Sequence, residues 1–190
     1  MSAALYQTTH IAKSNEFVFV TESGQTYRVY FDKKAPIFPL EELDEHAIYM
    51  GFSCTPKQVK FDRNHDAKIG NTIMWIIANM FASNKRYIIT YVCSPEDGQE
   101  RQRSITFGKW YNESNLSQKI RLERKNYDGT YCGVLCSKKH PLLEELDIAL
   151  EDFNPNNKFA EPEIEYGMED DGLSEGGFDE ENKFLNNHHQ

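Results

Sequence analysis

The sequence predicts an α+β fold, in which about three helices pack on a mostly antiparallel sheet in the order β-β-β-α-β-α-β-β-α. Two β-rich segments contain turn residues typical of hairpins, at Ser23-Gly24-Gln25 and at Asp128-Gly129. Residues 71–84 and 140–154 instead have apolar side chains at helical spacing. Together these patterns favour a sheet built largely from hairpins, with helices packed against it.

The first strands are predicted over residues 16–31, where Tyr27, Val29 and Phe31 alternate with more polar neighbours. This alternation indicates a hairpin with one buried face and one wetter face. Residues 47–54 predict a third strand, because apolar side chains again occupy every second position.

The helix predicted over residues 71–84 is the central packing element, because its apolar face is wide enough to require cover. Met74 and Trp75 widen that face, and Asn71 or Thr72 is expected to cap the first turn. The strand that follows is almost continuously apolar, which is typical of the interior of a sheet.

The second half begins with a helix predicted over residues 95–113. Residues 118–139 predict the second hairpin, and Pro141 is well placed in the first turn of the last helix. The apolar stripe of that helix closes the predicted body.

Charge divides the chain into a nearly neutral body and an acidic tail. Residues 1–154 carry 20 acidic and 19 basic side chains, whereas residues 155–190 carry 10 acidic and two basic ones. We expect an N-terminal extension over residues 1–14, a single domain over residues 15–154, and a flexible, disordered tail over residues 155–190.

The chain is expected to be a cytoplasmic protein that does not associate with membranes. No apolar run approaches the ~20 residues that a membrane-spanning helix needs, and the N-terminus lacks the basic start of a signal peptide. The four cysteines lie in or beside apolar runs, which favours reduced thiols.

The start of the helix over residues 95–113 combines an acid with nearby arginines. Ser94 and Asp97 have nearly the spacing of a capping box, with Pro95 at the first helical position. Arg101 lies one turn beyond Asp97 and is expected to pair with it.

Arg103, Phe107 and Trp110 fall on one stripe of the same helix. In the structural interpretation, the stem of Arg103 packs against the rings and its guanidinium reaches carbonyls or an acid. In the functional interpretation, it binds an anion in a cleft. The candidate catalytic residues for a phosphate-bearing substrate would then be Asp97, Arg101, Arg103 and Lys109.

The pattern Asp97-Gly98, Arg103, Phe107 and Trp110 after the strand "YIITYVC" resembles a small uncharacterised bacterial family classed as a domain of unknown function. The segment "FVFVTESGQTYRVYF" and the spacing of Asp66 to Thr72-Ile73 resemble the same family. The resemblance covers roughly residues 15–153, supports the boundaries of the domain and implies no activity.

Two apparent metal motifs fail, one because it lacks required residues and one on spacing, so no metal site and no cofactor is expected. Asp62, Asn64 and Asp66 begin a calcium-loop pattern that lacks its glycine and its final glutamate. Asp66 is instead expected to cap the following helix or turn. Cys132 and Cys136 would stand about 13 Å apart on a strand, too far for one zinc ion.

Cys93 ends a strand before a helix, where a helix dipole could activate its thiol. It is a weak candidate nucleophile because the sequence offers no histidine partner.

Basic residues are concentrated in the first strand of the second hairpin, at Lys119, Arg121, Arg124 and Lys125. Such a strand could contact the phosphates of a nucleic acid. Alternatively, it is a solvent-exposed edge strand whose charge prevents further strand pairing.

The acidic tail contains Phe178, Phe184 and Leu185, which could dock into a basic, hydrophobic groove of a partner. The tail could equally cover the basic strand, or serve only to keep the protein soluble.

No catalytic signature stands out, so the favoured function is that of a non-catalytic protein-binding or regulatory module. One alternative is an enzyme or toxin-like effector that acts on a phosphate-bearing substrate. A second is nucleic-acid binding through residues 119–125.

Overall fold

One seven-stranded sheet organises the chain. The computed structural model describes residues 4–33, 36–55, 66–127 and 129–151. The strands are β1 (Thr8–Ile11), β2 (Glu16–Val20), β3 (Thr26–Asp32), β4 (Ala47–Thr55), β5 (Ile88–Val92), β6 (Ile120–Tyr127) and β7 (Thr130–Ser137). Their order across the sheet is β1-β2-β3-β4-β5-β7-β6, which leaves β1 and β6 at the edges.

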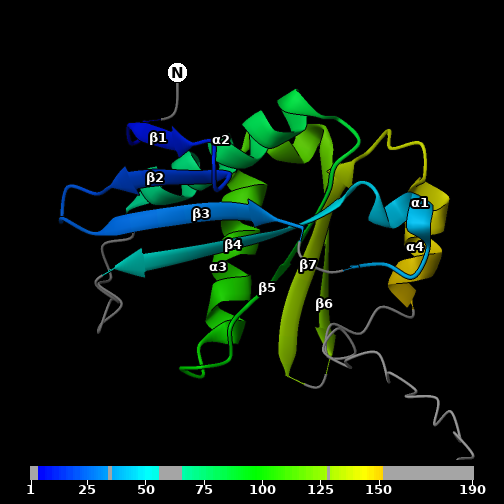
Figure 1. The fold of residues 1–190 in the computed structure, drawn as a ribbon. Helices are drawn as coiled ribbons and strands as arrows, with labels where there is room; N and C mark the ends of the chain where they lie inside the picture. The colour runs from blue at the N-terminus through cyan, green and yellow to red at the C-terminus, as the bar shows by residue number, and fades with distance from the viewer. Residues whose placement is uncertain (1–3, 34–35, 56–65, 128, 152–190) are drawn as a thin grey trace, which may run out of the picture. The chain divides into compact units, whose positions relative to one another are not determined.

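All neighbouring strands are antiparallel except β4 and β5. These two parallel strands pair over only three residues, the last pair being Tyr49 and Thr90, and then diverge (Figure 1). The predicted α+β class is therefore confirmed, as are the two hairpins. Strand β1 lies within the segment that the sequence analysis assigned to an N-terminal extension.

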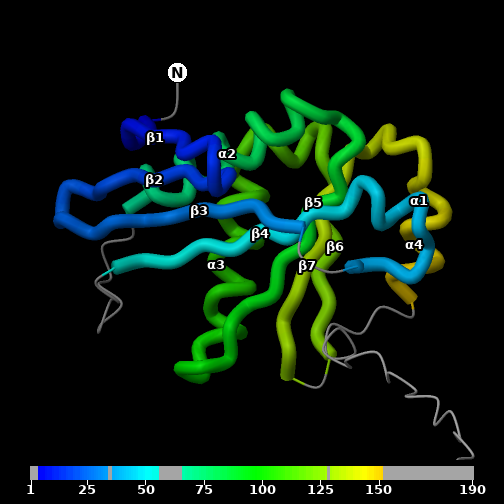
Figure 2. Tube along the Cα trace, in the orientation of Figure 1, coloured from blue at the N-terminus to red at the C-terminus, as the bar shows by residue number. Residues whose placement is uncertain are grey.

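Helices lie on both faces of the sheet. The helices are α1 (Glu41–Asp44), α2 (Ala67–Ser83), α3 (Glu100–Glu113), the 3₁₀ turn η1 (Asn115–Gln118) and α4 (Leu143–Glu151). α2 and α3 pack on one face, and α1 and α4 lie together on the other, near the end of the sheet formed by β5, β7 and β6 (Figure 2). The short α1 and η1 carry no clear periodic signal in the sequence.

The larger core lies between the sheet and α2. Ile73, Ile76 and Ile77 are completely buried there and meet the inward side chains of the strands, including Phe19 and Met50. Burial of an aliphatic side chain of this size stabilises a fold by about 1.5–3 kcal/mol, so α2 is the main packing element, as predicted. Its Trp75 is exposed, however, because it lies on the side of α2 away from the sheet.

α2 begins at Ala67, earlier than predicted. Asp66 is the N-cap, and its Oδ1 accepts a hydrogen bond from the Lys68 amide at 2.9 Å. The prediction that Asn71 or Thr72 caps the helix is therefore wrong, whereas the capping role predicted for Asp66 is confirmed. Thr72 lies inside the helix and donates its hydroxyl hydrogen to the Lys68 carbonyl.

α3 begins at Glu100 and not at residue 95, so the predicted capping box at Ser94 is also wrong. Gly98 has a φ of +67°, in the left-handed region that favours glycine, and it closes a turn in which its amide donates to the Pro95 carbonyl. This turn keeps residues 95–98 out of the helix.

A smaller core lies on the opposite face. Cys132, Val134 and Cys136 of β7 are buried there with Leu146 and Leu150 of α4. The prediction that the two cysteines share a face of a strand as small apolar side chains is confirmed.

Gly70 of α2 is required by the position of α3. The Trp110 ring lies so close to Gly70 that an added Cβ would overlap it. Alanine inside a helix is ordinarily more stable than glycine by up to about 1 kcal/mol, but here the clash should dominate. Gly70→Ala should therefore lower the free energy of unfolding by about 1–3 kcal/mol, measured by urea denaturation.

The variant Gly70→Ala/Trp110→Leu separates the two effects. Because leucine removes the indole ring that Cβ meets, the double variant should lose less stability than the sum of the two single variants. A Gly70→Ala protein more stable than the wild type would contradict this account of the α2–α3 contact.

Candidate functional site

Asp97 and Arg103 are paired to each other at the start of α3. Asp97 accepts hydrogen bonds from the Gln99 amide through Oδ1 and from the Arg103 guanidinium through Oδ2. The guanidinium also donates to the Ser94 carbonyl at 2.8 Å. The hydrogen bonds that Asp97 accepts from Arg103 and Gln99 lower the pKa of its carboxyl, and the bond from Arg103 contributes most. The part of the structural interpretation that concerns the guanidinium of Arg103 is confirmed, because this group reaches a carbonyl and an acid. The packing of its stem on the Phe107 and Trp110 rings stays a prediction.

Arg101 and Lys109 do not join that pair. Arg101 is exposed, and the prediction that it pairs with Asp97 is wrong because Asp97 lies in the turn before the helix. Lys109 lies about 12 Å beyond Arg101 along the axis of α3, at 1.5 Å per residue. Its Nζ is 3.8 Å from Oε1 of Glu113. The four candidate catalytic residues therefore do not converge on one point.

Cys93 is buried just after β5, several residues before α3 begins. Burial raises the pKa of its thiol from 9.0 to about 11, although Arg103 acts in the opposite direction. The suggested activation of Cys93 by a helix dipole is therefore wrong, because the pKa of the thiol is raised and the thiol is protonated at neutral pH.

The basic residues of β6 are divided between the two faces of the sheet by strand alternation. Arg121 lies on the α4 face, where it pairs with Asp147 at 2.6 Å and Glu123 at 3.4 Å. Lys125 shares that face and lies 3.9 Å from Glu123. Arg124 points to the α3 face and bonds the Ser104 carbonyl at 3.1 Å. β6 is an edge strand, as the structural alternative predicted, and it presents no continuous basic row.

Five cations that are scattered in the sequence gather where β5 and β6 begin and β7 ends. This sheet-end cluster consists of Lys85, Arg86, Lys119, Lys138 and Lys139, all exposed. The Lys138 amide donates to the Lys119 carbonyl at 3.0 Å, and His140 Nε2 lies 2.9 Å from the Arg86 carbonyl oxygen. None of the five forms an ion pair with another described residue. Only Lys119 belongs to the basic group recognised in the sequence.

One half of the sheet has a face on which no described helix packs. The face of β1–β3 and of β4 beyond its start, opposite α2, presents the open half-sheet, which turns toward the viewer in Figure 1. The start of β4 does not belong to it, because Ala47 is buried there with Leu43 of α1. The strand registers place on it Thr9, Ile11, Glu16, Val18, Val20, Thr26, Arg28, Tyr30, Asp32, Tyr49, Gly51, Ser53 and Thr55.

Exposed aliphatic groups and two half-buried tyrosines lie on this open half-sheet, and Tyr49 also packs against the smaller core. The Tyr30 ring lies over Gly51, where an added Cβ would overlap it, and its centroid is 6.4 Å from that of Tyr49. Val20 is 55% exposed, and Arg28 pairs with Glu16 at 3.3 Å. Alternation along the hairpin indicated this wetter face in the sequence, but not that it lacks a covering helix.

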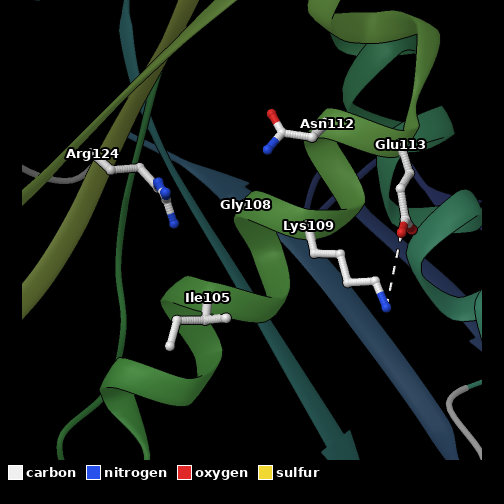
Figure 3. Close-up of a pocket in the computed structure, with 6 residues that line it drawn as sticks. All are labelled: Ile105, Gly108, Lys109, Asn112, Glu113 and Arg124. Carbon is white, nitrogen blue, oxygen red and sulfur yellow. Dashed lines mark ion pairs between the residues drawn. The ribbon is translucent and has the colours of Figure 1, made fainter.

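A recess of about 350 Å³ opens between α3 and β6. It is lined by Ile105, Gly108, Lys109, Asn112, Glu113 and Arg124. Figure 3 shows Arg124 extending from β6 toward α3, with the Asn112 side chain directed back toward it and Lys109 turned toward Glu113. The sequence analysis separated Lys109 and Arg124 into different candidate sites, because their proximity depends on how α3 packs on the sheet.

Metal ligands and membrane spans are absent from the described part of the chain. There, no group of three or more His, Cys, Asp or Glu side chains could hold a metal ion. No helix within the same residues is long and apolar enough to cross a bilayer. Asp62, Asn64 and the tail residues Phe178, Phe184 and Leu185 lie outside the described residues.

No protein-family model, curated protein or solved structure matches the chain. The resemblance to a bacterial family of unknown function therefore stays a prediction.

The raised pKa of Cys93 predicts a loss of stability in alkali. Between about pH 9 and pH 11, the unfolded chain releases this proton while the folded chain retains it, so stability is fully present below pH 9 and falls as the pH rises. Buried tyrosines make the unfolding free energy depend on pH in a similar way, so the wild type must be compared with Cys93→Ala. The difference in unfolding free energy between wild type and Cys93→Ala, from urea denaturation, should narrow from pH 9 to pH 11. A constant difference would contradict the burial of this thiol.

Proposed function

We propose that the protein is a non-catalytic module that binds another protein through the open half-sheet. The observation that carries the proposal is the exposure of Val20 and Ile11, together with the half-buried Val18 and Tyr30, on a face that no described helix covers. Exposed apolar surface rimmed by polar groups is typical of interaction sites in soluble proteins.

The composition of this surface suits a protein partner. Tyrosine and arginine are enriched in protein interfaces because they combine large contact area with hydrogen-bonding groups. Tyr30, Tyr49 and Arg28 lie together on the open half-sheet, and Gly51 leaves the Tyr30 ring flat against the strand. A flat, rigid platform of this kind loses little conformational entropy when a partner docks.

The enzyme alternative has weaker support from the geometry. Asp97 and Arg103 satisfy each other, and Lys109 is too distant to act on the same group. A catalytic site for a phosphate-bearing substrate would need these residues to converge.

Val20→Lys tests the protein-binding proposal, with Ile148→Lys as its matched control. Val20 and Ile148 are both exposed aliphatic residues, at 55% and 67%, but Ile148 lies on α4 and not on the open half-sheet. Lysine at position 20 places a charge that a docked partner would have to desolvate, so a partner recovered with wild type should be lost at least tenfold.

The measurement is affinity capture from the native cell with full-length variants, quantified by mass spectrometry. Thermal unfolding of each variant should be unchanged, because both side chains are exposed. The proposal fails if Val20→Lys and Ile148→Lys recover the same partners in the same amounts as the wild type.

A second candidate function is nucleic-acid binding through the sheet-end cluster. It is supported by five exposed cations from three chain segments that have no acidic partner among the described residues. Phosphate contacts by such groups release counterions, so affinity should fall steeply with salt.

Lys138→Glu/Lys139→Glu should weaken binding of a fluorescent single-stranded RNA at least tenfold in 50 mM salt. The control Lys13→Glu removes a positive charge at an exposed position near β1 and should change affinity little. Equal effects of the two changes, or affinity that does not depend on salt, would eliminate this candidate.

A further inference from the structure

Arg124 occupies a prepared position between β6 and α3. Its Nη1 donates to the Ser104 carbonyl at 3.1 Å, and a Cβ added at Gly108 would stand 2.5 Å from the same nitrogen. The guanidinium therefore lies against the backbone of α3, at a position where the helix has no side chain. This contact with the backbone of α3 fixes the orientation of the planar guanidinium, so the guanidinium loses less conformational entropy when it binds a ligand.

A second glycine makes room on the sheet side. Arg124 pairs across the strands with Gly133, which in turn pairs with Tyr91. An added Cβ at Gly133 would stand 2.5 Å from the Tyr91 hydroxyl oxygen. The Tyr91 and Arg124 side chains therefore lie over Gly133, between the sheet and α3.

The guanidinium has more donors than the described residues satisfy. A guanidinium has five N–H donors, and a carbonyl is the partner that the described residues provide. Arg121 on the same strand differs sharply, because it pairs with both Asp147 and Glu123. The charge of Arg124 has no carboxylate partner within the described part of the chain.

Two further polar groups lie near Arg124, one of which lines the recess. The Asn112 amide is directed toward Arg124 across the recess (Figure 3). The Tyr91 hydroxyl is buried with no hydrogen-bond partner among the described residues. Burial raises the pKa of this hydroxyl, and the nearby positive charge of Arg124 partly opposes that effect.

We infer that Arg124 and Asn112 form a binding site for an oxyanion, the carboxylate or phosphate group of a ligand that enters the α3–β6 recess. The open N–H groups of the guanidinium match the two oxygens of such a group, which is the geometry of strong bidentate recognition. The Asn112 amide supplies a further donor from the opposite wall. Lys109 is turned away toward Glu113, so it contributes charge near the rim and no direct contact.

Titration of the full-length protein with sodium phosphate tests the site, with sodium chloride at matched ionic strength as reference. The probes are the Arg124 Nε–Hε and Asn112 side-chain amide signals in nitrogen-15 NMR spectra. Both signals should shift saturably with phosphate and not with chloride. A parallel titration with sodium acetate separates the two sources of oxyanion, because tighter binding of either one identifies the preferred ligand.

Arg124→Lys keeps the charge and removes the planar fork, so it should weaken oxyanion binding at least tenfold, as read from the Asn112 signals. Arg101→Lys is the matched control, since Arg101 lies exposed on α3 outside the recess. Asn112→Ala removes an exposed side chain and provides a second test that leaves the contact of Arg124 with α3 intact.

Asn112→Ala should weaken binding several-fold without a change in thermal unfolding. If neither phosphate nor acetate shifts the two signals saturably, or if Arg124→Lys and Arg101→Lys bind equally well, the inference is wrong. Arg124 would then act only as a structural link between β6 and α3.

Discussion

The return of the chain from β4 to β5 through α2 is the constraint on which the rest of the structure depends. Parallel neighbours cannot be joined by a tight turn, so the connection must cross a face of the sheet. Here α2 makes that crossing and buries Ile73, Ile76 and Ile77 against the strands. The apolar helix is therefore both a connection and the centre of the larger core.

The position of α3 follows from α2. The Trp110 ring lies on Gly70, so α3 can approach α2 closely only because that position has no side chain. On its other side α3 meets Arg124 at Gly108. Two glycines on two different helices thus determine where α3 lies, and its position in turn shapes the α3–β6 recess.

The arrangement of helices also determines which surfaces remain available. α1 and α4 pack near one end of the sheet, over the buried residues of β7 and the start of β4, and the same face of β1–β3 and of the rest of β4 has no described helix on it. Val20 and Ile11 are exposed on this surface, whereas the Tyr30 and Tyr49 rings contact each other. The proposed docking of a protein on this surface would use the same hydrophobic effect that builds the core.

Alternation along β6 explains why a cluster of charges in the sequence does not become a cluster in space. Neighbouring residues of a strand point to opposite faces, so Arg121 meets Asp147 of α4 while Arg124 meets α3. Conversely, Lys85, Lys119 and Lys138 are distant in sequence and gather because three strands end at one side of the sheet. Linear spacing is a poor guide to charge density wherever strand order differs from chain order.

The sequence by itself determined the α+β class, the two hairpins and the apolar character of α2, because these depend on local periodicity and turn residues. Helix starts were predicted less well: Gly98 and the turn around it moved the start of α3, and Asp66 extended α2 toward its N-terminus. Only the tertiary structure decided that Arg124 faces Asn112 and that no described helix lies on half of one sheet face. Each of these depends on how elements distant in sequence pack together, and the physical reason is that side-chain partners are set by the crossover and by strand order, which local patterns do not encode.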